Sequence, residues 1–203
     1  MLVLDVDKDT RYTIQNYRDN MTDSEFMEFC MVNKRMRIER DQNQNIIIMA
    51  PLTGFSSYYE GKPFSKLDYW TENIYGKGVS FNSSVGFNLP NGSTRMPDAC
   101  WISPERWANV TEEDMEKFLT VIPDFVIEVR SKIDRLSRLQ DKMLEWIESG
   151  VRLAWLINPK DKQSIIYRSN GTIEIIDGFE NVLNGEDVAP GFEFDLKILR
   201  MPK

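Results

Sequence analysis

Two acidic residues and one lysine are spaced so that strands and a helix could bring them together. Asp98 follows Pro97 near the start of an expected strand, Glu128 lies within the apolar run 125–129, and Lys142 falls on the helix expected next. Carboxylates held on rigid strands can bind Mg²⁺, and a nearby lysine can position the attacking water. This set of residues therefore indicates metal-dependent cleavage of phosphodiester bonds.

The strand that carries Glu128 should also orient its neighbours. Side chains alternate along a strand, so Val126 is predicted to share one face with the charged residues Asp124, Glu128 and Arg130. The odd-numbered residues of the run 125–129 should point to the other face. Asp124 follows a proline at the start of the strand, which favours fixing a loop or a neighbouring helix end over binding metal. Because the run is otherwise apolar, its glutamate needs a buried partner.

Lys142 is predicted to reach the face of the sheet that carries Glu128. It is predicted beside Leu139 and Trp146, at the border of the apolar stripe of its helix, from where its four-carbon chain can reach back over the sheet. A buried carboxylate without a partner is costly, so a pair on adjacent strands is best explained by a bound cation. A structural ion pair between Glu128 and either Arg130 or Lys142 remains the alternative.

Residue types that are missing exclude several chemistries. The chain has no histidine, which removes Ser-His-Asp and Cys-His catalysis and histidine-based zinc or nuclease sites. Its two cysteines, Cys30 and Cys100, lack the spacing of a thiolate metal site or a disulfide framework. Cys100 is expected to be a small core residue. Carboxylate, lysine and metal chemistry is what remains.

The overall charge is the main objection to a nucleic-acid substrate. The net charge of −7 opposes non-specific binding, which normally depends on neutralising phosphates. Bound divalent metal would offset part of it. Positive charge gathers in two clusters, each of which fits a solvated face as well as a phosphate-binding surface. These are Lys34, Arg35, Arg37 and Arg40, and then Arg130, Lys132, Arg135, Arg138 and Lys142.

Length and composition predict one domain over 1–203. At 203 residues and 41% hydrophobic, the chain is long enough for one well-buried core and short for two full domains. No apolar stretch approaches a membrane span, and the acidic N-terminus MLVLDVDKDTRY does not fit a signal peptide. A cytoplasmic protein is therefore expected.

Helices and strands are predicted to alternate along the chain. The capping box Thr22-Asp23-Ser24-Glu25 starts a helix, and Pro63 should break or kink the first half of another helix over 56–75. Short helices should begin near 103 and 111, and a longer one should cover 133–147. Strands are predicted over 35–40, 45–50, 79–81, 85–89, 95–102, 125–129, 151–157, 163–168 and 172–176, with an edge strand over 191–196.

The strand–helix–strand order over 125–157 implies a crossover between parallel strands. The predicted fold class is α/β, a mixed β-sheet flanked by helices. Within it we expect an N-terminal helix and strands over about 20–90, a catalytic core over about 95–160, and a C-terminal hairpin and tail over about 161–203.

Four segments together resemble a known family, in the same order and with similar spacing. They are MRIERDQNQNIIIMAP (36–51), VGFNLPNGSTRMPDACWISPERW (85–107), PDFVIEVRSKIDRLSRLQDKMLEWIESGVRLAWLINP (123–159) and GEDVAPGF (185–192). The chain resembles the PD-(D/E)xK nuclease superfamily and, within it, the Uma-type restriction endonuclease family. The resemblance implies a restriction-endonuclease-like core, a divalent metal (Mg²⁺ or Mn²⁺) and hydrolysis of DNA.

The resemblance also implies residue roles. Asp98 matches the aspartate of the PD motif, and Glu128 matches the acidic residue of the (D/E)xK motif. Lys142 resembles a lysine that the family places on the next helix. Glu39 looks like an additional acidic metal ligand, so the implied metal set is Asp98, Glu128 and Glu39. Gln140 matches a recurrent polar position near the lysine.

Two departures from the family pattern affect the expected chemistry. Arg130 occupies the usual lysine position two residues after Glu128, where an arginine can only act as a charged supporting group. Trp146 stands where the family often has tyrosine, which leaves packing as its expected role. A catalytically inactive nuclease-fold protein that binds nucleic acid or protein is therefore the alternative. Cutting both DNA strands with one site per chain would favour a homodimer.

Overall fold

The structure is a computed structural model that describes residues 5–6, 11–14, 21–132 and 134–201. Ile133, where the long helix was expected to begin, lies outside these residues, as does much of the N-terminal segment. The chain forms two compact units. The first comprises Met1–Pro51, Ser84–Met96 and Val110–Val121, and the second Leu52–Ser83, Pro97–Asn109 and Ile122–Lys203. The expectation of a single domain stays a prediction.

The first unit contains a six-stranded sheet in the order β1-β2-β4-β3-β7-β6. Its helix α1 (Asp23–Val32) begins at the predicted capping box, in which Thr22 and Glu25 bond to each other's backbone N–H groups. Phe26 on α1 packs with Ile38 and Ile46 in a small apolar core. The other elements are β1 (Asp5–Val6), β2 (Arg11–Ile14), β3 (Arg37–Arg40), β4 (Ile46–Met49), β6 (Phe87–Asn88), β7 (Thr94–Arg95) and α4 (Glu112–Met115).

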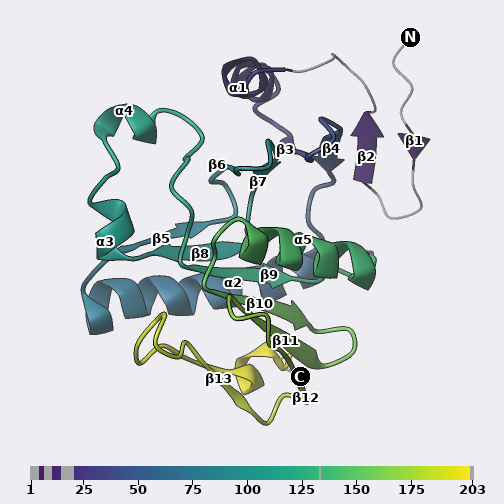
Figure 1. The fold of residues 1–203 in the computed structure, drawn as a ribbon. Coiled ribbons are helices and arrows are strands. Elements are labelled where there is room, and N and C mark those ends of the chain that lie inside the picture. The colour runs from purple at the N-terminus through teal and green to yellow at the C-terminus, as the bar shows by residue number, and fades with distance from the viewer. Residues whose placement is uncertain (1–4, 7–10, 15–20, 133, 202–203) are drawn as a thin grey trace. The chain divides into compact units, whose positions relative to one another are not determined.

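The second unit contains a mixed six-stranded sheet in the order β12-β11-β10-β9-β8-β5 (Figure 1). β9 and β10 are parallel, as the predicted crossover requires, and α5 connects them. α2 packs on β5, β8 and β9, whereas α5 packs on β9, β10 and β11. The elements are α2 (Gly54–Tyr69), η1 (Trp70–Tyr75), β5 (Val79–Asn82), β8 (Ala99–Ile102), α3 (Pro104–Trp107), β9 (Phe125–Val129), α5 (Leu136–Glu148), β10 (Leu153–Asn158), β11 (Gln163–Arg168), β12 (Ile173–Asp177), β13 (Val182–Asn184), β14 (Glu193–Asp195) and η2 (Leu196–Leu199).

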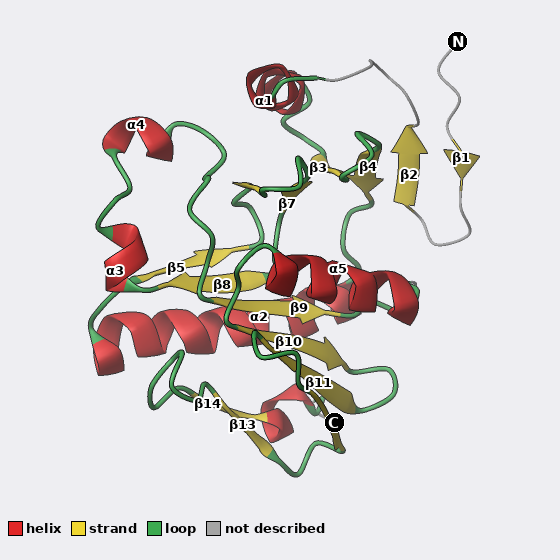
Figure 2. Cartoon of the chain, in the orientation of Figure 1, coloured by secondary structure: helices red, strands yellow, loops and turns green. Residues whose placement is uncertain are grey.

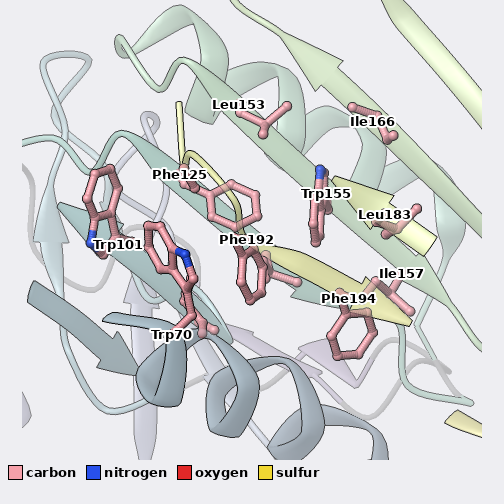
Figure 3. Close-up of a cluster of buried hydrophobic side chains, with 14 of the residues drawn as sticks. Trp70, Trp101, Phe125, Leu153, Trp155, Ile157, Ile166, Leu183, Phe192 and Phe194 are labelled. Carbon is pink, nitrogen blue, oxygen red and sulfur yellow. The ribbon is translucent and has the colours of Figure 1, made fainter. Parts of the chain in front are cut away.

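Alternation along β9 and β10 separates the two faces of this second sheet. Phe125 and Trp155 pack edge to face on one side, where Phe192 stacks on Trp155 (Figure 3). Trp70, at the end of α2, joins the same buried cluster. The even-numbered residues of β9, including Glu128, point to the opposite face, which α5 covers. One face of the sheet is therefore covered by a buried aromatic cluster, and the other face carries Glu128 and its partners on α5.

Several expected elements differ from those in the structure. The strand expected over 95–102 is two strands in different units, because Pro97, which has no backbone N–H to donate, lies between β7 and β8. Pro63 lies inside α2 without ending it, and the helix already begins at Gly54, capped by Thr53. The C-terminal strand β14 pairs with β13 in a separate two-stranded sheet instead of extending the main sheet.

The predicted fold class is confirmed, since strands alternate with helices along the chain and the sheet of the second unit is mixed (Figure 2). None of the helices in the described part of the chain has the length and apolar character needed to cross a membrane.

Candidate active site

Glu128 lies near the end of β9, a strand whose five residues are all buried. Its Oε1 atom is 2.7 Å from Lys142 Nζ and accepts a hydrogen bond of 3.1 Å from Trp146 Nε1. The side chains of Glu128 and Lys142 are only 4% and 7% exposed. Because both side chains are almost completely buried, solvent and salt screen the attraction between their charges only weakly.

A single helix supplies two partners of Glu128. α5 buries Leu139, Lys142, Met143 and Trp146 against the sheet. Lys142 and Trp146 are four residues apart, so they lie one above the other on the same helical face. The lysine is buried together with these apolar residues, whereas its sequence position predicted the border of the apolar stripe. The helix presents an amine and an indole N–H to one carboxylate oxygen.

Asp98 lies opposite Glu128 on the neighbouring strand. Ala99 of β8 pairs with Ile127 of β9, so the next position outward in this antiparallel register sets Asp98 against Glu128. Opposed residues on antiparallel strands have Cβ atoms about 4.5–5.5 Å apart. Asp98 Oδ2 accepts a hydrogen bond of 2.8 Å from the backbone N–H of Val129. The aspartate side chain thus supplies the acceptor for this backbone N–H just before β8 begins.

The structure brings three predicted site residues together within the second unit: Asp98, Glu128 and Lys142. The two carboxylates are oxygen ligands of the type that Mg²⁺ and Mn²⁺ prefer. In the described part of the chain, no three Cys, Asp or Glu side chains gather closely enough to hold a metal ion by themselves. Mg²⁺ commonly uses one or two carboxylates together with water and substrate phosphates, so a two-carboxylate site fits it.

Glu39 belongs to the first unit, on β3. Its Oε2 atom is 3.2 Å from Arg95 Nη1, and its Oε1 accepts a hydrogen bond of 3.0 Å from the Met96 backbone N–H. The side chain is 1% exposed, so this carboxylate is as deeply buried as Glu128. Its proposed part in metal binding stays a prediction.

The two predicted supporting residues contact other parts of the second unit. Arg130 Nη1 is 2.7 Å from Asp161 Oδ2, and its Nε donates to the Asp134 carbonyl at 3.1 Å. The guanidinium therefore joins the loop after β9 to the β10–β11 connection. The Gln140 side chain hydrogen-bonds to Tyr167 of β11, where burial is the larger influence and raises the pKa of the tyrosine.

Asp124 has the structural role that its position predicted. Its Oδ2 accepts a hydrogen bond of 2.8 Å from the backbone N–H of Ser103, the N-cap of α3. Its Oδ1 lies 3.3 Å from Arg106 Nε. Asp124 therefore fixes the start of a helix. Cys100 is fully buried, and burial raises the pKa of its thiol, as expected for a core residue instead of a nucleophile.

Trp146 is the site residue that sequence reasoning missed. Its indole N–H donates to Glu128, whereas the sequence had suggested packing alone. The available signal was its position four residues after Lys142, which places both side chains on one helical face. A buried tryptophan usually finds a partner for its N–H, so a tryptophan above a buried lysine and carboxylate predicts this contact.

The sheet, its flanking helices and the buried carboxylate–lysine arrangement define a nuclease-like α/β protein. A crystal structure from Anabaena variabilis ATCC 29413, described as "a putative nuclease belonging to DUF820", matches with a TM-score of 0.69 and 18% identity. The match covers 89% of this chain and 97% of that chain, and at this identity it shows the fold. The chain belongs to the Uma2 family, described as "Putative restriction endonuclease", whose model matches residues 23–197. No curated protein matches the sequence.

Proposed function

We propose that the protein is a Mg²⁺- or Mn²⁺-dependent endonuclease that hydrolyses phosphodiester bonds in DNA. The observation that carries this proposal is the pair of opposed carboxylates, Asp98 and Glu128, with the Lys142 amine 2.7 Å from Glu128 in a buried setting. Membership of a family described as restriction endonucleases supports the same reaction class.

Asp98 and Glu128, both in the second unit, would hold the divalent metal. When bound, the metal would supply Lewis-acid chemistry, which polarises the phosphate toward attack by water. Val129 fixes the Asp98 carboxylate through its backbone N–H, and Trp146 fixes Glu128. Both ligands are therefore oriented before substrate arrives, which reduces the entropy lost on binding.

Lys142 would act on the reacting groups. Its ammonium donates to Glu128 Oε1, and a lysine amine carries three N–H donors in all. It would orient the attacking water and stabilise the negative charge that develops on the phosphate oxygens. Water adds to phosphorus, the bond to one sugar oxygen breaks, and that oxygen leaves with a proton.

The test is cleavage of supercoiled and linear DNA in the presence of Mg²⁺ or Mn²⁺. Glu128→Gln keeps the size of the side chain and removes its charge, so we expect at least about a 100-fold loss of cleavage. Lys142→Met should cause a comparable loss while preserving the length of the side chain. Isothermal titration calorimetry should show that Mn²⁺ binds to the parent protein and to Lys142→Met, but not to Glu128→Gln.

The first unit offers a matched control for these substitutions. Glu113 and Lys117 form an exposed ion pair, 2.5 Å apart, at α4. Glu113→Gln and Lys117→Met repeat the same chemical changes and should leave cleavage unchanged. Cleavage that persists in both Glu128→Gln and Lys142→Met would refute the proposed site and would point to a contaminant or to a different site.

The alternative is a catalytically inactive protein that uses the nuclease fold to bind nucleic acid or protein. The net charge of −7 favours it, and so does the Glu128–Lys142 ion pair, which could stabilise the fold without any metal. The Mn²⁺ titration separates the two functions, because an inactive binding protein has no need of a metal at Asp98 and Glu128.

A further inference from the structure

The strand β12 forms one edge of the sheet in the second unit (Figure 1). It pairs with β11 on one side, and no other described strand pairs with it. Ile173 and Ile175 are 54% and 57% exposed, although isoleucine is usually buried in a sheet. An edge strand with exposed apolar side chains is a template on which another strand can pair.

The register of the β11–β12 hairpin shows which backbone groups point outward. Arg168 N–H donates to the Thr172 carbonyl at 3.1 Å, which makes these two residues a hydrogen-bonded pair. Such pairs alternate with non-bonded pairs along an antiparallel ladder. Ile173, Ile175 and Asp177 therefore direct their N–H and C=O groups away from β11, toward the open edge.

The side chains of β12 divide between the two faces of the sheet. Ile176 packs against the aromatic core. By alternation, Ile173 and Ile175 lie on the opposite face, where α5 packs over β9, β10 and β11. These two side chains are therefore at the end of the α5 face, beyond the strands on which the helix packs.

β12 lacks several of the features that normally block an edge, namely proline, a basic side chain and a bulge. Its sequence Ile-Glu-Ile-Ile-Asp contains no proline, lysine or arginine, and the strand is regularly paired with β11 along its whole length. Its acidic residues have partners on β11. Glu174 is 2.6 Å from Arg168, and Asp177 accepts a hydrogen bond of 2.9 Å from Gln163.

We propose that β12 pairs antiparallel with β12 of a second copy of this chain, about a two-fold axis at Ile175. In this register Ile173 faces the partner's Asp177, and the outward N–H and C=O groups of Ile173, Ile175 and Asp177 all gain partners. Ile175 meets its own copy across the axis. The two sheets then form one continuous sheet, with a symmetric interface as most homodimers have.

The positions of the acidic residues along β12 favour pairing with a second copy in this register. With the axis at Ile175, Glu174 lies opposite the partner's Ile176, so no two carboxylates are directly opposed. An axis at Glu174 or Asp177 would set like charges against each other, which destabilises a strand pair. An axis at Ile176 would leave the outward groups of Ile173 without partners. A parallel arrangement in register would also align each carboxylate with its copy.

The test uses charge at the two-fold axis. Sedimentation of the parent protein should show a dimer whose population rises with concentration in the micromolar range. Ile175→Lys and Ile175→Glu each place two like charges together, so each variant alone should be a monomer. An equimolar mixture of these two variants should form a heterodimer, because the opposed charges now attract. Ile74→Lys, at another isoleucine that is 65% exposed, should remain dimeric like the parent.

Two outcomes would overturn the proposal. One is a parent protein that stays monomeric throughout this concentration range. The other is a mixture of Ile175→Lys and Ile175→Glu that fails to associate, since loss of fold alone would also make each variant monomeric but could not produce the heterodimer. Circular dichroism of each variant checks that it is folded. The result does not depend on DNA cleavage, so it stands apart from the proposed function.

Discussion

Glu39 and Glu128 are both buried carboxylates on strands, one in each unit, and each accepts hydrogen bonds from a cation and from a neutral N–H. The cation is Arg95 for Glu39 and Lys142 for Glu128. The neutral donor is the backbone of Met96 in the first case and the indole of Trp146 in the second. Two carboxylates with similar burial thus have chemically different surroundings.

The difference lies in what each set of partners can do. Arg95 remains protonated and Met96 donates from the backbone, so the surroundings of Glu39 hold a fixed charge in a fixed place. Lys142 and Trp146 are side chains on one helix, and a lysine amine can change partners by rotation or lose its proton. The Glu128 arrangement is therefore suited to exchanging partners during a reaction, while that of Glu39 is suited to holding structure.

The largest expected effect on stability follows from removing Lys142. In Lys142→Met the buried carboxylate of Glu128 loses its counter-ion, and breaking a buried ion pair in this way costs about 3–5 kcal/mol. Urea unfolding should show this loss in the free energy of unfolding. The double variant Glu128→Gln with Lys142→Met should recover most of it, because the neutral amide has no charge to compensate.

The exposed pair at α4 is again the control. Lys117→Met should produce no measurable change in the free energy of unfolding, since its side chain is 55% exposed. If the double variant at Glu128 and Lys142 loses as much as the two single variants added together, the ion pair is not what sets the stability of this region.

A smaller effect is expected from the equivalent change in the first unit. In Arg95→Met, Glu39 keeps the hydrogen bond from the Met96 N–H, and the Arg95 side chain is already 12% exposed. We expect a loss of about 2 kcal/mol, the value of one hydrogen bond to a charged group. Hydrogen exchange should localise the effect to β3. A loss as large as that of Lys142→Met would show that the two carboxylates are held equally.

The sequence could predict the main site because its residues follow regular periodicities. Alternation placed Glu128 on the polar face of its strand, and helical spacing placed Lys142 over that face. The sequence placed Asp98 on a neighbouring strand, but its position opposite Glu128 needed the register of β8 and β9, which depends on long-range pairing. The position of Arg130 was harder to predict, because it follows the last residue of β9 and its direction depends on Asp161, far along the chain.

Two predicted elements, the helix that contains Pro63 and the strand over 95–102, differ from the structure for identifiable reasons. Pro63 was expected to disturb its helix, but packing of Leu67 and Trp70 in the core outweighs the local preference against proline. The expected strand over 95–102 looked continuous because both halves have strand-like residues. Only the pairing of Thr94 with Arg40 and Asn88, and of Ala99 with Ile127, shows that the halves belong to different sheets.

The smallest expected effect comes from comparing the indole N–H groups of two buried tryptophans in the second unit. Trp146 Nε1 donates to Glu128, whereas Trp155 Nε1 has no hydrogen-bond partner among the described residues. Both side chains are fully buried, so replacing either with phenylalanine removes a similar volume. Trp146→Phe also removes a donor to a charged group, whereas Trp155→Phe removes an unsatisfied N–H, which can be nearly neutral.

We therefore expect Trp146→Phe to lose about 1.5 kcal/mol more than Trp155→Phe in the free energy of unfolding. The extra loss should be roughly halved when each change is made in the Glu128→Gln background, because the hydrogen bond to a neutral amide is about half as strong. Urea unfolding of the four variants measures this difference. Equal losses in both backgrounds would mean that the indole N–H does not hold Glu128, and its orienting role in the proposed site would have to be abandoned.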